Sequence, residues 1–173
     1  MYKDASELMS QCKEQNKRIW QIAVENEMKL TSSSYEDILS RFDDRLEIMF
    51  HSAQKALNAK QATKGGLIDG VAKTQYDYSK KENISGRYIN YVMSLAYSCS
   101  EVNASMGKIC ASPTAGSCGI VPAVLLGLSQ AKNISREKTL EGLITASAVG
   151  AIYTKNATVA GADGGCQAEC GVA

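Results

Sequence analysis

The chain has 173 residues, of which 45% are hydrophobic and 21% charged, with a formal net charge of +1. This length suffices for one domain, since domains of this size bury roughly 70% of their unfolded surface. Near-neutral charge argues against nucleic acid as a partner, because phosphate recognition needs clustered Lys and Arg. The apolar run at 120–128 is far shorter than the roughly 20 residues that cross a bilayer, and MYKDASELMSQCKEQ lacks a signal peptide's apolar core. We therefore expect a cytoplasmic protein with no membrane segment.

Helical periodicity begins at the N-terminus. Asp4 and Glu7 form an Asp-x-x-Glu helix start, a variant of the capping box, and the apolar pattern after it runs to Leu30. Ser34 and Asp37 open a second helix, whose apolar residues recur at steps of three or four. These residues are Ile38, Phe42, Leu46, Met49, Phe50, Ala53 and Leu57. Both apolar stripes predict core-facing helices.

Glycines and hydroxyl residues divide the rest of the chain. Gly65 and Gly66 are expected to end the second helix, in a loop that reaches Gly70. Three further helices are predicted over 86–101, 120–131 and 137–153, the last with Ser135 as its N-cap. The inward residues expected on the first of these three are Ile89, Val92, Met93 and Ala96. Because no stretch alternates with period two, the sequence predicts an all-α fold, with a single helical domain over residues 1–173.

The segment 110–119, CASPTAGSCG, is rich in hydroxyl residues and leads into an apolar helix. Ser112, Thr114 and Ser117 supply the hydroxyls, while Gly116 and Gly119 permit tight turns. Free N–H groups and the positive end of a helix dipole favour anions at such a place. The segment is therefore compatible with a substrate carboxylate or a phosphate site, and equally with a simple turn capped by hydroxyls.

Six cysteines occur in the chain, at positions 12, 99, 110, 118, 166 and 170. A disulfide framework is not expected, because the cytosol keeps thiols reduced. Cys12 and Cys99 fall in helical patterns and are expected to be small buried residues. Cys118 lies at a helix entrance that favours its thiolate. The only histidine, His51, falls in the second helix as a surface or core residue, so a cysteine hydrolase has little support.

The closing segment GADGGCQAECGVA places Cys166 and Cys170 in a Cys-x-x-x-Cys pattern. Zinc sites usually combine two such pairs, and this chain has no partner pair. Iron–sulfur clusters take cysteine ligands from loops in which glycine lets the backbone approach. Gly164 and Gly165 meet that need, although an ordinary turn uses the same residues.

Two longer stretches carry a resemblance to a known family. EVNASMGKICASPTAGSCGIVPAVLLG, followed by NATVAGADGGCQAECGVA, closely resembles the α chain of the iron–sulfur-dependent L-serine dehydratases. The family's Pro-Thr-x-Gly segment corresponds to 113–116 and its Gly-Cys-Gln-x-Glu segment to 165–169. The helix-rich sequence before them, including ASELMSQCKEQN, is also similar, so the resemblance spans nearly the whole chain.

The resemblance implies a lyase that converts L-serine to pyruvate and ammonia without pyridoxal phosphate. It implies a 4Fe–4S cluster with three cysteine ligands, whose open iron acts as a Lewis acid on the serine 3-hydroxyl while a base removes the α-proton. Aminoacrylate then tautomerises to an imine, which hydrolyses to pyruvate. A β chain or β domain is the implied partner, and the implied enzyme is an oligomer. The cluster serves as an electrophile and need not change its redox state.

The family's residues transfer to this chain only in part. The Gly-Cys-Gln cysteine, a cluster ligand, corresponds to Cys166, and the family's other two ligands belong to a downstream Cys-Asp-Pro…Pro-Cys segment. We therefore expect the chain to be incomplete as given and inactive alone, with its remaining ligands beyond residue 173. Cys110, Cys118 and Cys170 are not assigned as ligands. Thr114, Gly116 and Ser117 correspond to the segment expected to line the serine site, and the α-proton base is unassigned.

The chain departs from the family at GLIDGVA, 66–72, where members usually have Gly-Leu-Thr-Gly-Gly-Asp-Ala. Ile68 replaces a hydroxyl, Asp69 replaces a glycine and Val71 replaces an acid. Asp69 is costly if that backbone needs positive φ. The alternative is a non-catalytic helical interaction module without a cluster. A pyridoxal-phosphate lyase would need a Schiff-base lysine, and no pattern around Lys108 or Lys155 supports one.

Overall fold

The computed structural model describes residues 2–173, and these contain nine helices and no strand. The all-α prediction is confirmed. The helices are α1 (Ala5–Gln15), α2 (Ile19–Thr31), α3 (Tyr35–Lys55), α4 (Val71–Ser79), α5 (Arg87–Ala104), α6 (Ile120–Lys132), α7 (Arg136–Asn156), α8 (Gly161–Gly164) and α9 (Cys166–Val172). No helix among residues 2–173 is long and apolar enough to cross a membrane.

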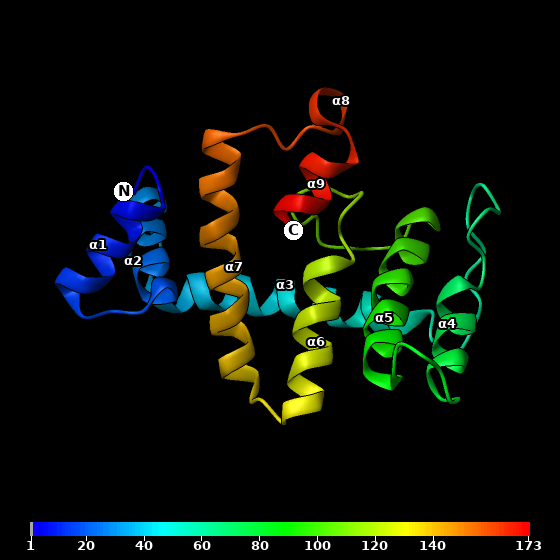
Figure 1. Cartoon of the computed structure of the whole chain (residues 1–173). Coiled ribbons are helices and arrows are strands. Elements are labelled where there is room, and N and C mark those ends of the chain that lie inside the picture. Colours follow the sequence, from blue (N-terminus) through cyan, green and yellow to red (C-terminus); the bar gives the residue numbers. More distant parts are fainter. Residues whose placement is uncertain (1) are drawn as a thin grey trace.

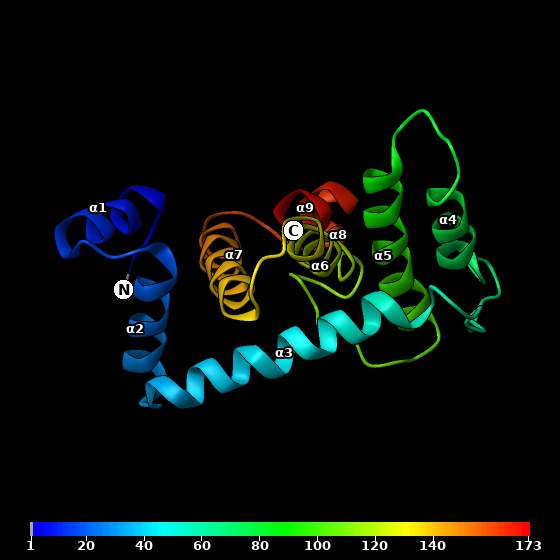
Figure 2. The same cartoon turned by 90° about the horizontal axis from the view of Figure 1, so that it is seen from below.

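Helix α3 is the base of the fold, and α7, α6 and α5 lie side by side across it (Figures 1 and 2). The α1–α2 pair covers one end of this layer and packs on α7, while α4 packs on α5 at the other end. The short helices α8 and α9 lie near the loop that enters α6 (Figure 1). The arrangement therefore brings residues near 115 and residues near 169 to the same side of the layer.

The capping residues set the helix starts as predicted. Asp4 accepts a hydrogen bond from the backbone N–H of Glu7 at 2.9 Å. Ser34 caps α3 with a complete capping box, and Ser135 accepts from the N–H of Lys138 at the start of α7. Each side chain satisfies an N–H group that has no partner within its helix.

The apolar stripe of α3 packs as the spacing predicts. Leu46 and Ala53 are fully buried, Ile38 is 1% exposed, and Phe42 and Phe50 pack against the core clusters. The helix ends earlier than predicted, at Lys55 rather than beside the glycines. The N-terminal pattern is also two helices rather than one, because Asn16 adopts a left-handed conformation after α1, with φ 51°. Helix α4 has no counterpart in the sequence prediction.

The buried face of α5 is more polar than predicted. Ile89 and Met93 were expected to face inward, but they are 52% and 38% exposed. The buried face instead carries amide, hydroxyl and acidic groups: Asn90, Ser94, Ser98 and Glu101, beside Leu95, Cys99 and Val102. These polar groups have partners. Ser98 Oγ donates to the carbonyl of Ser52 at 2.7 Å and accepts from the N–H of Ala56 at 2.9 Å, which joins α5 to α3.

Glu101 is a fully buried carboxylate at the end of α5. Its Oε1 accepts a hydrogen bond from the N–H of Ala72 at 2.6 Å, in the first turn of α4, and its Oε2 accepts from Gln61 at 3.4 Å. Gly70, the N-cap of α4, has no side chain to do this. Glu101 therefore supplies, from outside α4, the acceptor for a backbone N–H in the first turn of that helix.

Candidate functional site

The loop before α6 is held by its own hydroxyl groups. Ser117 is 2% exposed, and its Oγ donates to the carbonyl of Ser112 at 2.9 Å and lies 3.3 Å from the hydroxyl of Thr114. The Ser112–Pro113 peptide bond is cis. Asn103, at the end of α5, donates to the carbonyl of Ala115 at 3.0 Å. Ser117 therefore closes the turn, whereas Thr114 is half-buried and Gly116 is exposed.

The start of α6 is packed against α5. A Cβ atom on Gly119 would lie 2.5 Å from the carbonyl oxygen of Ala96, so only glycine permits this approach. Cys118 and Pro122 are buried on either side of it. The predicted anion site at the helix entrance is therefore restricted to its outer part, at 114–116.

The C-terminal segment meets this loop through Glu169. A Cβ atom on Gly116 would lie 2.5 Å from Glu169 Oε2, and one on Gly161 would lie 2.7 Å from Oε1. The carboxylate therefore fills the space over two glycines, one in each candidate segment. Glu169 is half-buried, and within residues 2–173 its carboxylate has no hydrogen bond or ion pair. A carboxylate has about four acceptor positions, so this group is available to a cationic or hydrogen-bonding ligand.

Cys118 is a core residue rather than an activated thiol. It is 1% exposed, and burial raises its pKa, so the predicted favoured thiolate at the helix entrance is wrong. Cys12 and Cys99 are buried as predicted, and burial raises the pKa of Cys99 to about 12. His51 is exposed on α3, as predicted. The described residues therefore hold no activated cysteine–histidine pair.

The remaining thiols differ in accessibility. Cys110 is half-buried, and burial raises its pKa against the opposing effect of Arg45. Cys166 begins α9 after Gly165, whose φ of +72° places it in the region that favours glycine. Cys166 and Cys170 are both exposed, and their Sγ atoms are 3.4 Å apart. Their hydrogen bond is the largest cause of the raised pKa of Cys170, to which slight desolvation and the charges of Cys166 and Glu169 add.

Within residues 2–173 no three His, Cys, Asp or Glu side chains come close enough to hold a metal ion together. The structure thus places Cys166 and Cys170 side by side and keeps Cys110 and Cys118 apart from them. Cys166 fits one ligand position of a cluster, because its thiol is exposed on a glycine-flanked turn. The described residues do not by themselves supply a set of three cysteine ligands.

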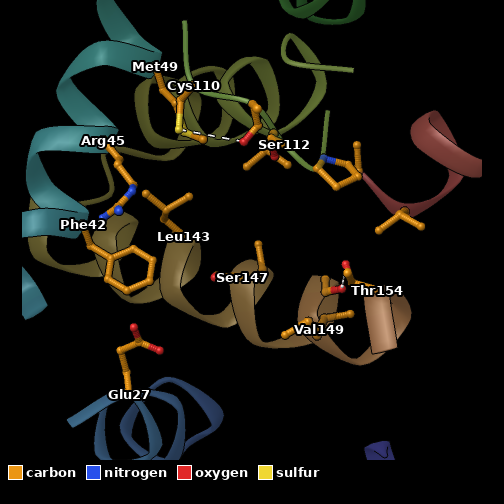
Figure 3. A pocket seen from close by; sticks show the side chains of 18 of the residues that line it. Glu27, Phe42, Arg45, Met49, Cys110, Ser112, Leu143, Ser147, Val149 and Thr154 are labelled. Atoms are coloured by element: carbon orange, nitrogen blue, oxygen red, sulfur yellow. Dashed lines mark hydrogen bonds between the residues drawn. The ribbon is translucent and has the colours of Figure 1, made fainter. Parts of the chain in front are cut away.

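A cleft of about 860 Å³ lies beside both candidate segments, between α3 and α7 (Figure 3). The loop contributes Cys110, Ser112 and Pro113 to its wall, and the C-terminus contributes Val172 and Ala173. Its charged lining comprises Glu27, Arg41, Arg45 and Lys155. The Arg45 guanidinium lies over the Phe42 ring at 5.8 Å. Thr114, Gly116, Ser117 and Cys166 do not line this cleft, so we place the candidate site where Glu169 meets the loop.

Comparison with known proteins now decides the family. The profile described as serine dehydratase alpha chain matches residues 14–173. This chain belongs to the serine dehydratase alpha chain family. It is similar to the L-serine dehydratase alpha chain of Peptoniphilus asaccharolyticus, with 41% identity over 174 residues, which cover 100% of this chain and 60% of that relative.

Two further relatives of this serine dehydratase family member match over the same length with lower identity. The probable L-serine dehydratase alpha chain of Bacillus subtilis is 37% identical over 173 residues, covering 100% of this chain and 58% of that protein. L-serine dehydratase 1 of Escherichia coli is 30% identical over 178 residues, covering 99% of this chain and 39% of that protein. The chain therefore spans about 60% or less of the length of these relatives. No solved structure matches it significantly.

The segment 66–72, where this chain differs from the usual serine dehydratase sequence, has a structural explanation. Asp69 accepts hydrogen bonds from the N–H and the hydroxyl of Thr63 at 2.9 and 2.5 Å, and it lies 3.7 Å from Lys60 Nζ. The hydrogen bonds from Thr63 are the largest cause of the lowered pKa of Asp69. Gly66 and Gly70 have positive φ and Asp69 does not. The substitution therefore does not place Asp in a conformation that requires glycine, and its carboxylate joins the two ends of the loop.

Sequence reasoning missed two acidic residues near these segments. Glu169 lies inside the Gly-Cys-Gln-x-Glu motif, so its position was marked, but the motif does not reveal that it faces Gly116. Glu101 opens the EVNASMG stretch, where a buried acid at a helix end has no signal in a single sequence. The contacts of both residues become visible only in the tertiary structure.

Proposed function

We propose that this chain forms part of an L-serine dehydratase, which dehydrates and deaminates L-serine to pyruvate and ammonia. Membership of the serine dehydratase alpha chain family supports this proposal, as do relatives named L-serine dehydratase in three bacteria. The main observation in support of the site is the contact between the two motif segments, in which the Glu169 carboxylate lies over Gly116. A site formed at this contact uses residues from both motifs.

L-serine is a zwitterion, and the residues at this contact match its two charges. We assign the α-ammonium group to Glu169, whose carboxylate has no protein partner among residues 2–173. The α-carboxylate is assigned to the Thr114 hydroxyl and the backbone about Gly116, on the exposed side of the loop. Ser117 has a supporting role, because its hydroxyl already donates to Ser112. The two ends of serine are thereby fixed, which orients its α-proton and 3-hydroxyl for elimination.

The reaction removes the α-proton and expels the 3-hydroxyl as water. The resulting aminoacrylate tautomerises to an imine, and hydrolysis gives pyruvate and ammonia. Cys166 is proposed as one ligand of a 4Fe–4S cluster, and the other ligands are assigned to the part of the relatives that this chain does not match. Residues 2–173 do not by themselves assemble the ligand set of such a cluster. No residue of the site is assigned as the α-proton base.

The proposal extends to partners and location. The name alpha chain, carried by two of the relatives, supports a β chain or β domain as the partner. We further propose a cytoplasmic, oligomeric enzyme that uses no pyridoxal phosphate and binds no nucleic acid. The single helical domain over residues 1–173 stays a prediction.

A chimaeric enzyme tests the proposed function. Residues 1–173 replace the matching portion of the Peptoniphilus asaccharolyticus alpha chain, and the chimaera is purified anaerobically with that enzyme's β chain. Formation of pyruvate from L-serine is expected. Loss of the charge in Glu169→Gln is expected to lower kcat/KM by about 10- to 100-fold, since hydrogen bonds to charged groups contribute about 1.5–3 kcal/mol.

Glu14→Gln is the matched control, because Glu14 is exposed on α1 and lies in neither motif. Its kcat/KM is expected to equal that of the unmodified chimaera. A folded chimaera with an intact cluster and no pyruvate formation would contradict the proposed function. Full activity in Glu169→Gln would remove Glu169 from the site without affecting the family assignment.

A further inference from the structure

Cys166 and Cys170 form an exposed dithiol on one face of α9. They are four residues apart, and their Sγ atoms are 3.4 Å from each other. Residues at this spacing are neighbours on a helix surface. No residue of α8 or α9 is buried, so both thiols lie at the surface of the described chain.

The helix geometry permits a covalent bond between these thiols. An ideal helix separates the Cα atoms of residues i and i+4 by about 6.2 Å, which follows from its rise and radius. Disulfides span Cα separations of roughly 4.4–6.8 Å, and their sulfur atoms lie about 2.05 Å apart. The two sulfurs must therefore approach by about 1.3 Å, and small side-chain rotations achieve most of this.

The surroundings of α9 allow that adjustment. The helix has seven residues, begins after Gly165 and contains Gly171. A Cβ atom on Gly171 would have no neighbour within 4 Å, so this end of the helix has open space beside it. Little packing has to be broken when the two side chains turn toward each other.

The other four cysteines lack these properties. Cys12, Cys99 and Cys118 are buried, and Cys110 is half-buried against the cleft. Burial also raises the pKa of Cys99, Cys110 and Cys118. A disulfide dissolved in water therefore reaches the exposed pair in α9 more readily than the other four thiols.

We propose that Cys166 and Cys170 are a redox modification site, at which a low-molecular-weight disulfide such as glutathione disulfide forms a reversible intramolecular disulfide. One thiolate attacks the glutathione disulfide, which creates a mixed disulfide and releases one glutathione. The second thiol gives its proton to water and attacks the protein sulfur of the mixed disulfide, which releases the second glutathione. The protein dithiol loses two electrons, and glutathione disulfide gains them.

This bond has a consequence that rests on the proposed function. A sulfur engaged in a disulfide cannot act as a thiolate ligand, so oxidation withdraws Cys166 from the cluster position. Reduction by a dithiol restores it. Exposed disulfides are the ones most readily reduced and re-formed, which suits a reversible state rather than a structural cross-link.

Mass spectrometry of the full chain tests the disulfide directly. Chelator-treated, reduced protein is incubated with glutathione disulfide, quenched with acid, alkylated and digested with trypsin. Cleavage after Lys155, the last Lys or Arg, leaves both cysteines in the peptide 156–173. We expect this peptide to be unalkylated and lighter than its reduced form by two hydrogen atoms. Dithiothreitol is expected to restore two alkylated cysteines.

Two variants provide the controls. Cys170→Ser removes the resolving thiol, so the mixed disulfide with glutathione is expected to accumulate on Cys166. The double variant Cys170→Ser/Val172→Cys retains two thiols but places them about 120° apart around the helix and more than one turn apart along it, and it is expected to form mixed disulfides in place of the internal one.

Wild-type peptide with glutathione on both cysteines would overturn the proposal. So would disulfide-linked dimers, or no oxidation at a glutathione disulfide concentration that fully modifies Cys166 in Cys170→Ser. The measurement involves neither L-serine nor a cluster. Failure here therefore leaves the proposed function intact, and an inactive chimaera leaves the disulfide intact.

Discussion

Replacing Gly119 with alanine tests whether the loop before α6 is held in place by close contact with α5. The new Cβ atom would lie 2.5 Å from the carbonyl oxygen of Ala96 and 3.1 Å from its Cα and carbonyl carbon. These obstacles are backbone atoms, so α6 has to move away from α5. Overpacking of this kind costs about 1–3 kcal/mol. The φ of Gly119 is −87°, which alanine adopts without strain, so reduced freedom of the unfolded chain returns about 0.4–1 kcal/mol.

The net expectation for Gly119→Ala is a loss of about 1–2 kcal/mol in the free energy of unfolding. Gly150→Ala is the control, because Gly150 lies within α7 and a Cβ atom there has no neighbour within 4 Å. That variant is expected to gain about 0.5–1 kcal/mol, since alanine is the better helix former. Urea unfolding followed by far-UV circular dichroism measures both. A Gly119→Ala protein as stable as the wild type would refute the close contact.

Three further variants test the packing. Cys99 has a pKa raised to about 12, so the unfolded chain loses this thiol proton first as the pH rises. The free energy of unfolding is therefore expected to fall between about pH 9 and pH 12, and Cys99 accounts for about 1.4 kcal/mol of this fall per pH unit. In Cys99→Ala this part of the pH dependence is expected to be absent. Ser34→Ala removes the cap of α3 and is expected to cost about 1 kcal/mol in urea unfolding, with α3 retained. Among residues 2–173, Trp20 Nε1 is buried without a hydrogen-bond partner, so Trp20→Phe is expected to cost only the packing of the lost ring atoms, about 1–2 kcal/mol in urea unfolding, and a loss above about 3 kcal/mol would contradict the unpaired N–H.

The helices were predictable where local signals and burial agree. Ser34 and Ser135 mark helix starts because a cap is a contact between residues close in sequence. On α5 the apolar pattern selected Ile89 and Met93, which are exposed, while Ser94 is buried. The error has a physical cause: hydroxyl groups on this face bond to backbone carbonyls and can therefore be buried without an unpaired group.

The sequence indicated the two segments of the candidate site, but it did not show that they lie next to each other. The spacing drew attention to Thr114, Gly116 and Cys166, and it indicated that glycine lets the backbone come close. It did not reveal which group comes close to Gly116, because Glu169 is brought there by the path of α7 and α8. It also predicted a favoured thiolate at Cys118, which is wrong because a helix entrance activates a thiol only where solvent reaches it.

The last turn of α5 connects two parts of the chain that do not follow each other in sequence. Glu101 binds the N–H of Ala72, and the Ala104 carbonyl accepts from the N–H of Lys64 at 2.9 Å. One residue before Ala104, Asn103 binds the carbonyl of Ala115. A single helical turn is thus a common anchor for the divergent 66–72 segment and the hydroxyl-rich loop. Substitutions at 68–71 can accordingly alter the position of Thr114 and Gly116 without touching them, by tilting the turn to which both segments are tied.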